Sequence, residues 1–314
     1  MATRETWPEL PFSSWSDTLD TLHRWTQIVG KTRMSHAPMQ NHWWHATLYL
    51  TPRGLATSSV PDGGRSFDIE FDFIDHALVI RVSDGTTRSI PLRPMTVADF
   101  YHEYVGVLQS VGIDANIYPV PMEMSDTLRF DEDRIHSSYD ADAVSRCWRV
   151  LAQADRLFKI IRGPYLGKSS PSHFWWGGFD LSCTRFSGRR APVHPGGVPN
   201  CPDYVQVEAY SHECMSVGWW PGSAGGLEEP AFYAYVYPAP AGCYVEPIRP
   251  AAAGYHTGMG EWILPYDAVR TSPDPDALVL SFCQSTYEAA ANYGKWDRSS
   301  LERRASVEPG KRKS

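Results

Sequence analysis

Two segments of the chain carry the same pattern of residues and constrain the fold more than any other feature. Residues 41–50 (NHWWHATLYL) and 172–181 (SHFWWGGFDL) both pass from a polar residue through a histidine, three bulky positions and two small residues to an apolar end. Both patterns end in alternating apolar positions, which is typical of a β-strand. The repeated pattern predicts an internal duplication.

The order of the other predicted elements supports a duplication. Helical apolar spacing predicts helices at 15–29, 97–111, 142–161 and 275–293, the first ending at Gly30. Strands are predicted at 42–51, 67–73, 78–82, near 90, at 173–181, 205–215, 232–237 and 261–264. Phe100 and Gly112 match Phe282 and Gly294 at one constant offset, so the closing helices of the two halves align.

We therefore expect an α+β protein of two similar halves related by a pseudo-two-fold axis. Each half would have a mainly antiparallel sheet flanked by helices. The expected division is 1–125 for the first repeat and 126–297 for the second, packed as one compact unit. Residues 298–314 are rich in Lys and Arg and lack large aromatic residues after the predicted core, which predicts a flexible charged tail.

The segment 67–73 alternates apolar and acidic residues. This period predicts a strand with one buried face and one wet face. Asp68, Glu70 and Asp72 lie on the wet face. We interpret them as a solvated row opposite Arg81 rather than as metal ligands.

Composition narrows the possible partners. The chain of 314 residues has a formal net charge of -7 and contains 12 Trp, 16 Tyr and 12 Phe. A negative net charge provides no positive electrostatic potential to attract nucleic acid. Aromatic residues build protein cores and line small-molecule pockets. We find no apolar run long enough to span a membrane and no secretory signal. The six scattered cysteines indicate reduced thiols in a cytoplasmic protein.

The alternation of side chains along the two predicted His-aromatic strands suggests where a site would lie. His42 and His173 begin the more apolar face in both halves, so we interpret them as structural. The opposite face is aromatic with a few polar groups, which is typical of ligand pockets. Its predicted ligand-binding residues are Trp43, Tyr49, Trp176 and Asp180, with His45 as a catalytic candidate.

Further acid and base candidates lie elsewhere in the chain. Asp131, Asp133 and His136 occupy the linker between the halves, where they would supply acid and base groups or form only local turns and ion pairs. His212 and Glu213 are candidates too, although neighbours on a strand face opposite ways and cannot share one metal. Arg53 and Arg185 would hold an anionic group.

Five motifs resemble an uncharacterised bacterial family, known as a domain of unknown function. They are WTQIVGK (25–31), NHWWH (41–45), FDFIDH (71–76), FDED (130–133) and TRFSGRRAP (184–192), and the similarity spans about residues 7–296. The resemblance implies a bacterial, cytoplasmic protein and brings no activity or cofactor with it.

Two functions stay open at this point. One is a small-molecule enzyme that uses acid–base or metal-assisted chemistry, and the other is a non-catalytic protein that sequesters an apolar or aromatic ligand. The sequence leaves open the reaction, the cofactor, any bound metal and the oligomeric state.

Overall fold

The computed structural model describes residues 5–223 and 226–303, which form an α+β protein with two antiparallel sheets. The first sheet has the order β1-β2-β4-β5-β6, with β3 paired to β4. Its strands are β1 (Tyr49–Leu50), β2 (Gly54–Ala56), β3 (Val60–Asp62), β4 (Arg65–Asp72), β5 (Ala77–Val82) and β6 (Thr87–Pro91).

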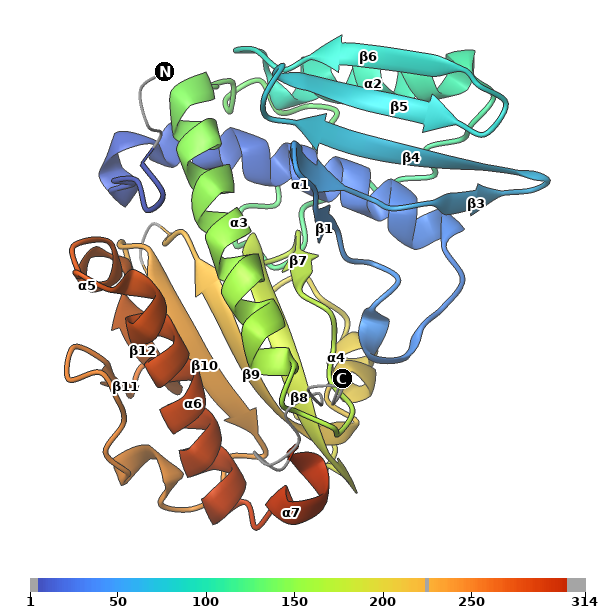
Figure 1. The fold of residues 1–314 in the computed structure, drawn as a ribbon. Coiled ribbons are helices and arrows are strands. Elements are labelled where there is room, and N and C mark those ends of the chain that lie inside the picture. Colours follow the sequence, from blue (N-terminus) through green and yellow to red (C-terminus); the bar gives the residue numbers. More distant parts are fainter. Residues whose placement is uncertain (1–4, 224–225, 304–314) are drawn as a thin grey trace, which may run out of the picture.

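The second sheet has the order β11-β12-β10-β9-β8-β7. Its strands are β7 (His173–Trp175), β8 (Asp180–Arg190), β9 (His212–Trp220), β10 (Ala231–Tyr237), β11 (Gly254–His256) and β12 (Glu261–Pro265). The two sheets meet where Leu48 and Phe174 exchange two backbone hydrogen bonds of 2.9 Å beside β1 and β7 (Figure 1). Two meanders that meet in this way are consistent with a duplication, which stays a hypothesis.

The helices surround the sheets. They are α1 (Ser16–His36), α2 (Val97–Ser110), α3 (Ala141–Arg162), α4 (Asp203–Ala209), α5 (Tyr266–Arg270), α6 (Pro275–Tyr293) and α7 (Arg298–Leu301), with 3-10 turns η1 (Phe12–Ser14), η2 (Asn41–Trp43) and η3 (Cys243–Val245). Helices α3 and α6 lie over one face of the second sheet (Figure 1). A single large core joins both sheets, and within it the ring of Trp25 stacks on Phe100 at 4.6 Å.

The predicted strand at 42–51 is wrong for most of its length. Residues Asn41–Trp43 form η2 instead, with φ of 59° at His42 and 61° at Trp43, and only Tyr49–Leu50 form a strand. Two successive left-handed residues turn the chain, which overrides the extended preference of the aromatic run. His42 and His173 are therefore not equivalent. Gly112 and Gly294 also differ, with φ of 73° and −73°.

Three further predicted boundaries are wrong. The strand expected at 173–181 is two strands, β7 ending at Trp175 and β8 beginning at Asp180, with a turn between them. Helix α1 continues through Gly30 to His36, because that glycine lies against the indole of Trp176 and does not end the helix. The segment expected as one strand at 205–215 begins as helix α4 and becomes strand β9 only at His212. Asp203 in the first turn favours that helix start, because its negative charge interacts with the positive end of the helix dipole.

The acidic row on β4 is paired with arginines. Arg81 donates to Asp68 at 2.9 Å and to Glu70 at 2.7 Å, as the register of β4 and β5 requires. Glu70 and Asp72 are more buried than a solvated row would be. Because their carboxylates bond to arginines, the row serves the sheet and not a metal.

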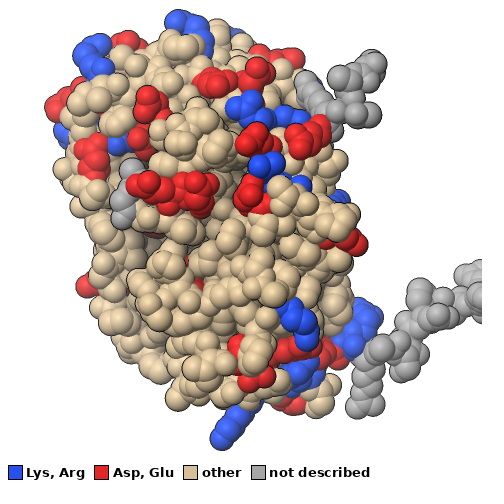
Figure 2. Space-filling view, turned by 90° about the vertical axis from the view of Figure 1, so that its left-hand side faces the viewer, with Lys and Arg blue, Asp and Glu red and all other residues tan. Residues whose placement is uncertain are grey.

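The charged C-terminal segment differs from the expected flexible tail over its first residues. Helix α7 packs through buried Leu301, whose carbonyl accepts from the backbone N–H of Leu166 at 2.7 Å. The remainder of the expected tail, 304–314, lies outside the described residues. On the face shown in Figure 2, Lys and Arg are interspersed with Asp and Glu. In the described part of the chain, every helix is too short or too polar to cross a bilayer.

Candidate functional site

A cavity of about 380 Å³ lies on the face of the second sheet opposite α3 and α6. Turn η2 and helix α4, which pack against each other, form part of its wall. The volume is that of a small-molecule site. Eight aromatic side chains line it: Trp43, Trp44, Trp175, Phe186, Tyr210, Trp220, Tyr233 and Tyr235.

Strand alternation supplies the floor of the cavity. Residues two apart on a strand face the same way, so β8 presents Asp180, Ser182 and Thr184 while its other face packs under the helices. Thr184 and Ser216 of the next strand form a hydrogen bond of 2.7 Å between their hydroxyls. The indole N–H of Trp175 donates to Ser182 at 3.0 Å. These contacts satisfy the floor hydroxyls and hold them in place.

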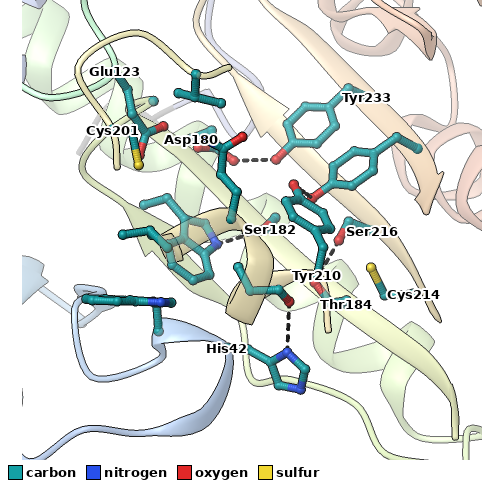
Figure 3. Close-up of a pocket in the computed structure, with 18 of the residues that line it drawn as sticks. His42, Glu123, Asp180, Ser182, Thr184, Cys201, Tyr210, Cys214, Ser216 and Tyr233 are labelled. Carbon is teal, nitrogen blue, oxygen red and sulfur yellow. Dashed lines mark hydrogen bonds between the residues drawn. The ribbon is translucent and has the colours of Figure 1, made fainter. Parts of the chain in front are cut away.

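Asp180 and Tyr233 form the central pair of the cavity. Tyr233 pairs with Gly218 across β9 and β10, and a Cβ at that glycine would lie 2.2 Å from the tyrosine ring. Because Gly218 has no side chain, the Tyr233 ring can lie over β9. Its hydroxyl donates to the carboxylate of Asp180 (Figure 3). Burial raises the pKa of Asp180 to about 7, an effect that the Tyr233 hydrogen bond opposes and the charge of Glu123 reinforces.

Two more carboxyls line the same cavity. Burial first, and then the charge of Asp180, raise the pKa of Glu261 on β12 to about 7. The side chain of Glu123 is exposed to solvent within the cavity. Protein atoms around its carboxyl still remove part of its hydration, which raises its pKa. Glu123 and Asp180 lie at the same end of the cavity, with His42 at the other end (Figure 3). Three carboxyls with raised pKa in one cavity are typical of an acid–base site.

Helix α1 holds the segment that carries Glu123. The side-chain amide of Gln27 makes two hydrogen bonds of 2.8 Å with the backbone of Met122. One turn later, the ammonium of Lys31 donates to the carbonyl of Val120 at 2.8 Å. His23, one turn earlier, bonds to the carbonyl of Gly177 at 2.8 Å. One helix face thus positions both Glu123 and the glycine turn beside it.

We expect Gly177→Ala to move the Glu123 carboxylate without unfolding the protein. A Cβ at Gly177 would lie 2.3 Å from a carboxylate oxygen of Glu123, at the free end of a flexible side chain. Since Glu123 raises the pKa of Asp180, that pKa should fall below about 7 in the variant. Carboxyl ¹³C NMR titration measures it. Gly254→Ala, where an added Cβ meets nothing within 4 Å, is the control. An unchanged Asp180 titration would contradict the predicted contact.

His42, which we interpreted as structural, lies at the cavity. Its Nδ1–H donates to the carbonyl of Ala209 at 2.8 Å, which leaves Nε2 to accept from the ammonium of Lys168 at 2.8 Å. Burial lowers the pKa of His42, and the nearby Lys168 lowers it further. The imidazole is therefore neutral, and its two hydrogen bonds tie η2 to α4 and to the loop before β7.

Four non-glycine residues at the cavity have left-handed backbone angles. His42, Trp43 and Glu123 line it, Phe179 precedes Asp180, and all four have φ between 55° and 61°. A bulky or acidic residue in this left-handed region costs of order 1–3 kcal/mol and is found preferentially at functional sites. These backbone conformations lower stability, so their presence at the cavity indicates selection for something other than stability.

Of the twelve residues predicted from the sequence, two line the cavity, namely Trp43 and Asp180. His45 is buried behind Trp43 and its Nδ1 accepts from the backbone N–H of Gln40 at 3.2 Å. Trp176 is buried against Gly30 and donates to the carbonyl of Ala46. Tyr49 packs on His173 at 5.5 Å.

The two predicted arginines bond elsewhere. Arg53 pairs with Asp72 and Asp75 at the end of β4. The guanidinium of Arg185 lies between the rings of Tyr165 and Tyr287, 5.0 and 4.4 Å from their centres. Neither arginine lines the cavity, so neither can hold an anion there.

The linker residues form a local network of turns and ion pairs. Asp133 is fully buried, accepts from the backbone N–H groups of Ile135 and His136, and bonds to the His136 ring at 2.8 Å. Asp131 pairs with Arg129 at 2.7 Å. This is the Asx-turn arrangement that we weighed against a catalytic role, and it lies outside the cavity.

His212 and Glu213, at the start of β9, face opposite sides of the sheet, as predicted. Glu213 accepts from Arg189 at 2.6 Å and from Ser187 at 2.8 Å. The ring of His212 lies 5.7 Å from that of His42, near the wall of the cavity but not in it. Alternation along β9 places them on opposite faces.

Several cavity residues had not been singled out from the sequence: Glu123, Tyr233, Tyr235 and Glu261. The alternation of Tyr233, Tyr235 and Tyr237 is a detectable signal, because it gives one strand face three phenols. Glu123 had no such signal, since its position depends on contacts between α1 and an irregular segment.

Thiol and metal chemistry receive little support from the side chains of the cavity. Burial raises the pKa of Cys201 to about 11 and of Cys214 to about 12, so both thiols are protonated at neutral pH. Within residues 5–223 and 226–303, no group of three or more His, Cys, Asp or Glu side chains is arranged to hold a metal ion.

Comparison with known proteins agrees with the resemblance noted in the motifs. The chain shows no significant similarity to any curated protein or to any solved structure. One family model, described as a family of unknown function, matches residues 7–303 and so spans almost the whole fold, cavity included. The chain belongs to this family of unknown function, DUF5996.

Proposed function

We propose that the cavity is the active site of an enzyme that acts on a small organic molecule by acid–base chemistry. The observation that carries the proposal is the Asp180–Tyr233 pair, a buried carboxyl with a pKa of about 7 at the floor of a cavity of ligand size. A proton-transfer group is most effective when its pKa is near the working pH.

The three carboxyls supply both an acid and a base. Asp180 and Glu261 each titrate near neutrality, and the charge of Asp180 raises the pKa of Glu261, so the two titrations are coupled. When Asp180 has ionised, its charge holds the proton on Glu261. In the proposed reaction the ionised group accepts a proton from the substrate and the protonated group donates one.

Tyr233 positions Asp180 in this proposal. Burial and the charge of Asp180 raise the pKa of the phenol well above its usual value of 10, so it stays protonated and donates to the carboxylate. One oxygen of Asp180 is engaged by this hydrogen bond. In the proposed reaction the other oxygen exchanges the proton with the substrate, as a general base requires.

A screen for turnover tests the proposal. Purified protein would be incubated with a panel of amines, amino acids, sugars and nucleosides, and consumed compounds identified by mass spectrometry. Any activity found should fall at least about a hundredfold in Asp180→Asn, because the amide cannot exchange the proton. Asp131→Asn, the same change outside the cavity, is the control. Full activity in Asp180→Asn would contradict the proposal.

The alternative is a non-catalytic protein that sequesters a small ligand. It is favoured by the eight aromatic side chains, which would hold an apolar or aromatic ligand without any reaction. Quenching of tryptophan fluorescence by panel compounds, with none of them consumed, would support this function over the enzyme.

A bacterial, cytoplasmic setting belongs to the same proposal. It is supported by the six cysteines, all of which are free thiols, and by the family resemblance in the motifs. The formal net charge of -7 gives no reason to invoke nucleic acid as a partner.

A further inference from the structure

The carboxyls of the cavity differ from the fully buried carboxylates elsewhere in the protein. Elsewhere these pair with arginine: Asp133 lies 3.3 Å from Arg24, Glu70 lies 2.7 Å from Arg81, and Asp72 bonds to Arg53. In the described part of the chain, no Lys or Arg lines the cavity or contributes to the electrostatics of its three carboxyls. Asp180 and Glu261 are shielded from water without a cation, which is costly, so a positive partner is missing here.

The aromatic wall favours the same kind of partner. The faces of Trp and Tyr rings attract cations, and an aromatic cage beside carboxylates is a common way to bind ammonium groups. Trp43 and Trp175 line the cavity together with Tyr233 and Tyr235. His42, the basic side chain that lines the cavity, is neutral and bonded to Ala209 and Lys168, so it offers no charge to the carboxyls.

A buried amide at the wall also lacks a partner. The side chain of Gln206 on α4 lines the cavity and is only 4% exposed. Among the described residues, neither its amide nitrogen nor its amide oxygen has a hydrogen-bond partner, and the same holds for the indole nitrogen of Trp43. Unpaired indole nitrogens also occur at Trp residues outside the cavity, but buried amides are nearly always bonded, so Gln206 indicates a bound molecule with its own polar atoms.

We propose that the ligand of this cavity is a small organic cation, a protonated amine or a quaternary ammonium compound, whose charged nitrogen lies among Glu123, Asp180 and Glu261 against the aromatic wall. This inference rests on the proposed function, since it names the substrate class of the same site. The cavity of about 380 Å³ limits the ligand to a small molecule.

Two matched pairs of probes test the charge requirement. Choline would be compared with its neutral isostere 3,3-dimethylbutan-1-ol, and benzylamine with benzyl alcohol, by calorimetry and tryptophan fluorescence at pH 8. We expect at least one cation to bind about tenfold or more tightly than its neutral partner. Equal or tighter binding of both neutral compounds, or no cation binding up to about 10 mM, would overturn the proposal.

Variants locate the binding in the cavity. Asp180→Asn should weaken the cation about tenfold and leave its neutral partner unchanged, because only the charge is removed. The control Asp131→Asn should leave both affinities unchanged. A cation whose affinity is the same in Asp180→Asn would place its site elsewhere and overturn the proposal. Turnover of a neutral compound that depends on Asp180 would instead support the enzyme while overturning the cation.

Discussion

Replacing Gly30 with alanine is expected to lower the free energy of unfolding by about 3 kcal/mol. An alanine Cβ at this position would lie 2.2 Å from the indole of Trp176, too close for any real contact. The indole cannot easily move, because it is 5% exposed and its N–H donates to the carbonyl of Ala46. Urea unfolding followed by circular dichroism measures the loss.

Gly106→Ala is the matched control for this substitution. Both glycines lie within helices, but an added Cβ at Gly106 on α2 meets nothing within 4 Å. Alanine is the better helix former, so this variant should gain roughly 0.5–1 kcal/mol. Opposite signs for the two changes would establish that Gly30 serves close packing. A gain in both would show that Trp176 does not lie against α1.

Gly30 also shows why some helix ends could not be predicted. A glycine at the end of an apolar helical pattern is a common stop signal. The same residue is tolerated inside a helix when another element needs to approach closely. Only the position of Trp176, which follows β7 in the other half of the chain, decides between the two. The residues next to Gly30 in the sequence give no sign of its contact with Trp176.

Elements whose pattern is satisfied locally were predicted well. Helices α2, α3 and α6 have regular apolar spacing and capping residues whose side chains accept from the first turn: Thr96, Asp140 and Asp274. Strand β4 has a strict period of two and pairs with β5 across a short turn. The region around His42 has aromatic residues typical of a strand, but two left-handed residues exclude that structure.

The candidate site was predictable only in part for a related reason. Asp180 was selected from the alternation of one predicted strand at 173–181, but a turn interrupts that strand, and Asp180 begins β8 opposite Trp175 rather than sharing a face with Trp176. Its partners Tyr233, Glu261 and Glu123 come from β10, from β12 and from an irregular segment held by α1. A site assembled from four separate elements depends on the order of strands in the sheet, which residue patterns do not specify.

Asp180→Asn is expected to make the protein more stable at pH 8 by about 2 kcal/mol and to leave it unchanged at pH 4. The folded protein holds the Asp180 proton up to a pKa of about 7, against 3.8 for an ordinary aspartate, because of burial and the charge of Glu123. Between these two values only the unfolded chain ionises. Stability of the wild-type protein therefore falls as the pH rises from about 4 to about 7 and stays low above it.

The Asp180→Asn variant has no carboxyl to ionise at this position, so its unfolding free energy should depend less on pH. Its amide oxygen can still accept the hydrogen bond from Tyr233. Urea unfolding at pH 4, 6 and 8 measures the difference. Asp131→Asn, which removes an ion pair with Arg129 at the surface, should bring no gain at any pH. A loss of stability in Asp180→Asn at pH 8 would mean that the folded protein stabilises the ionised carboxylate. A gain there, together with the loss of turnover, would show that the fold retains an unfavourable carboxyl for its chemistry.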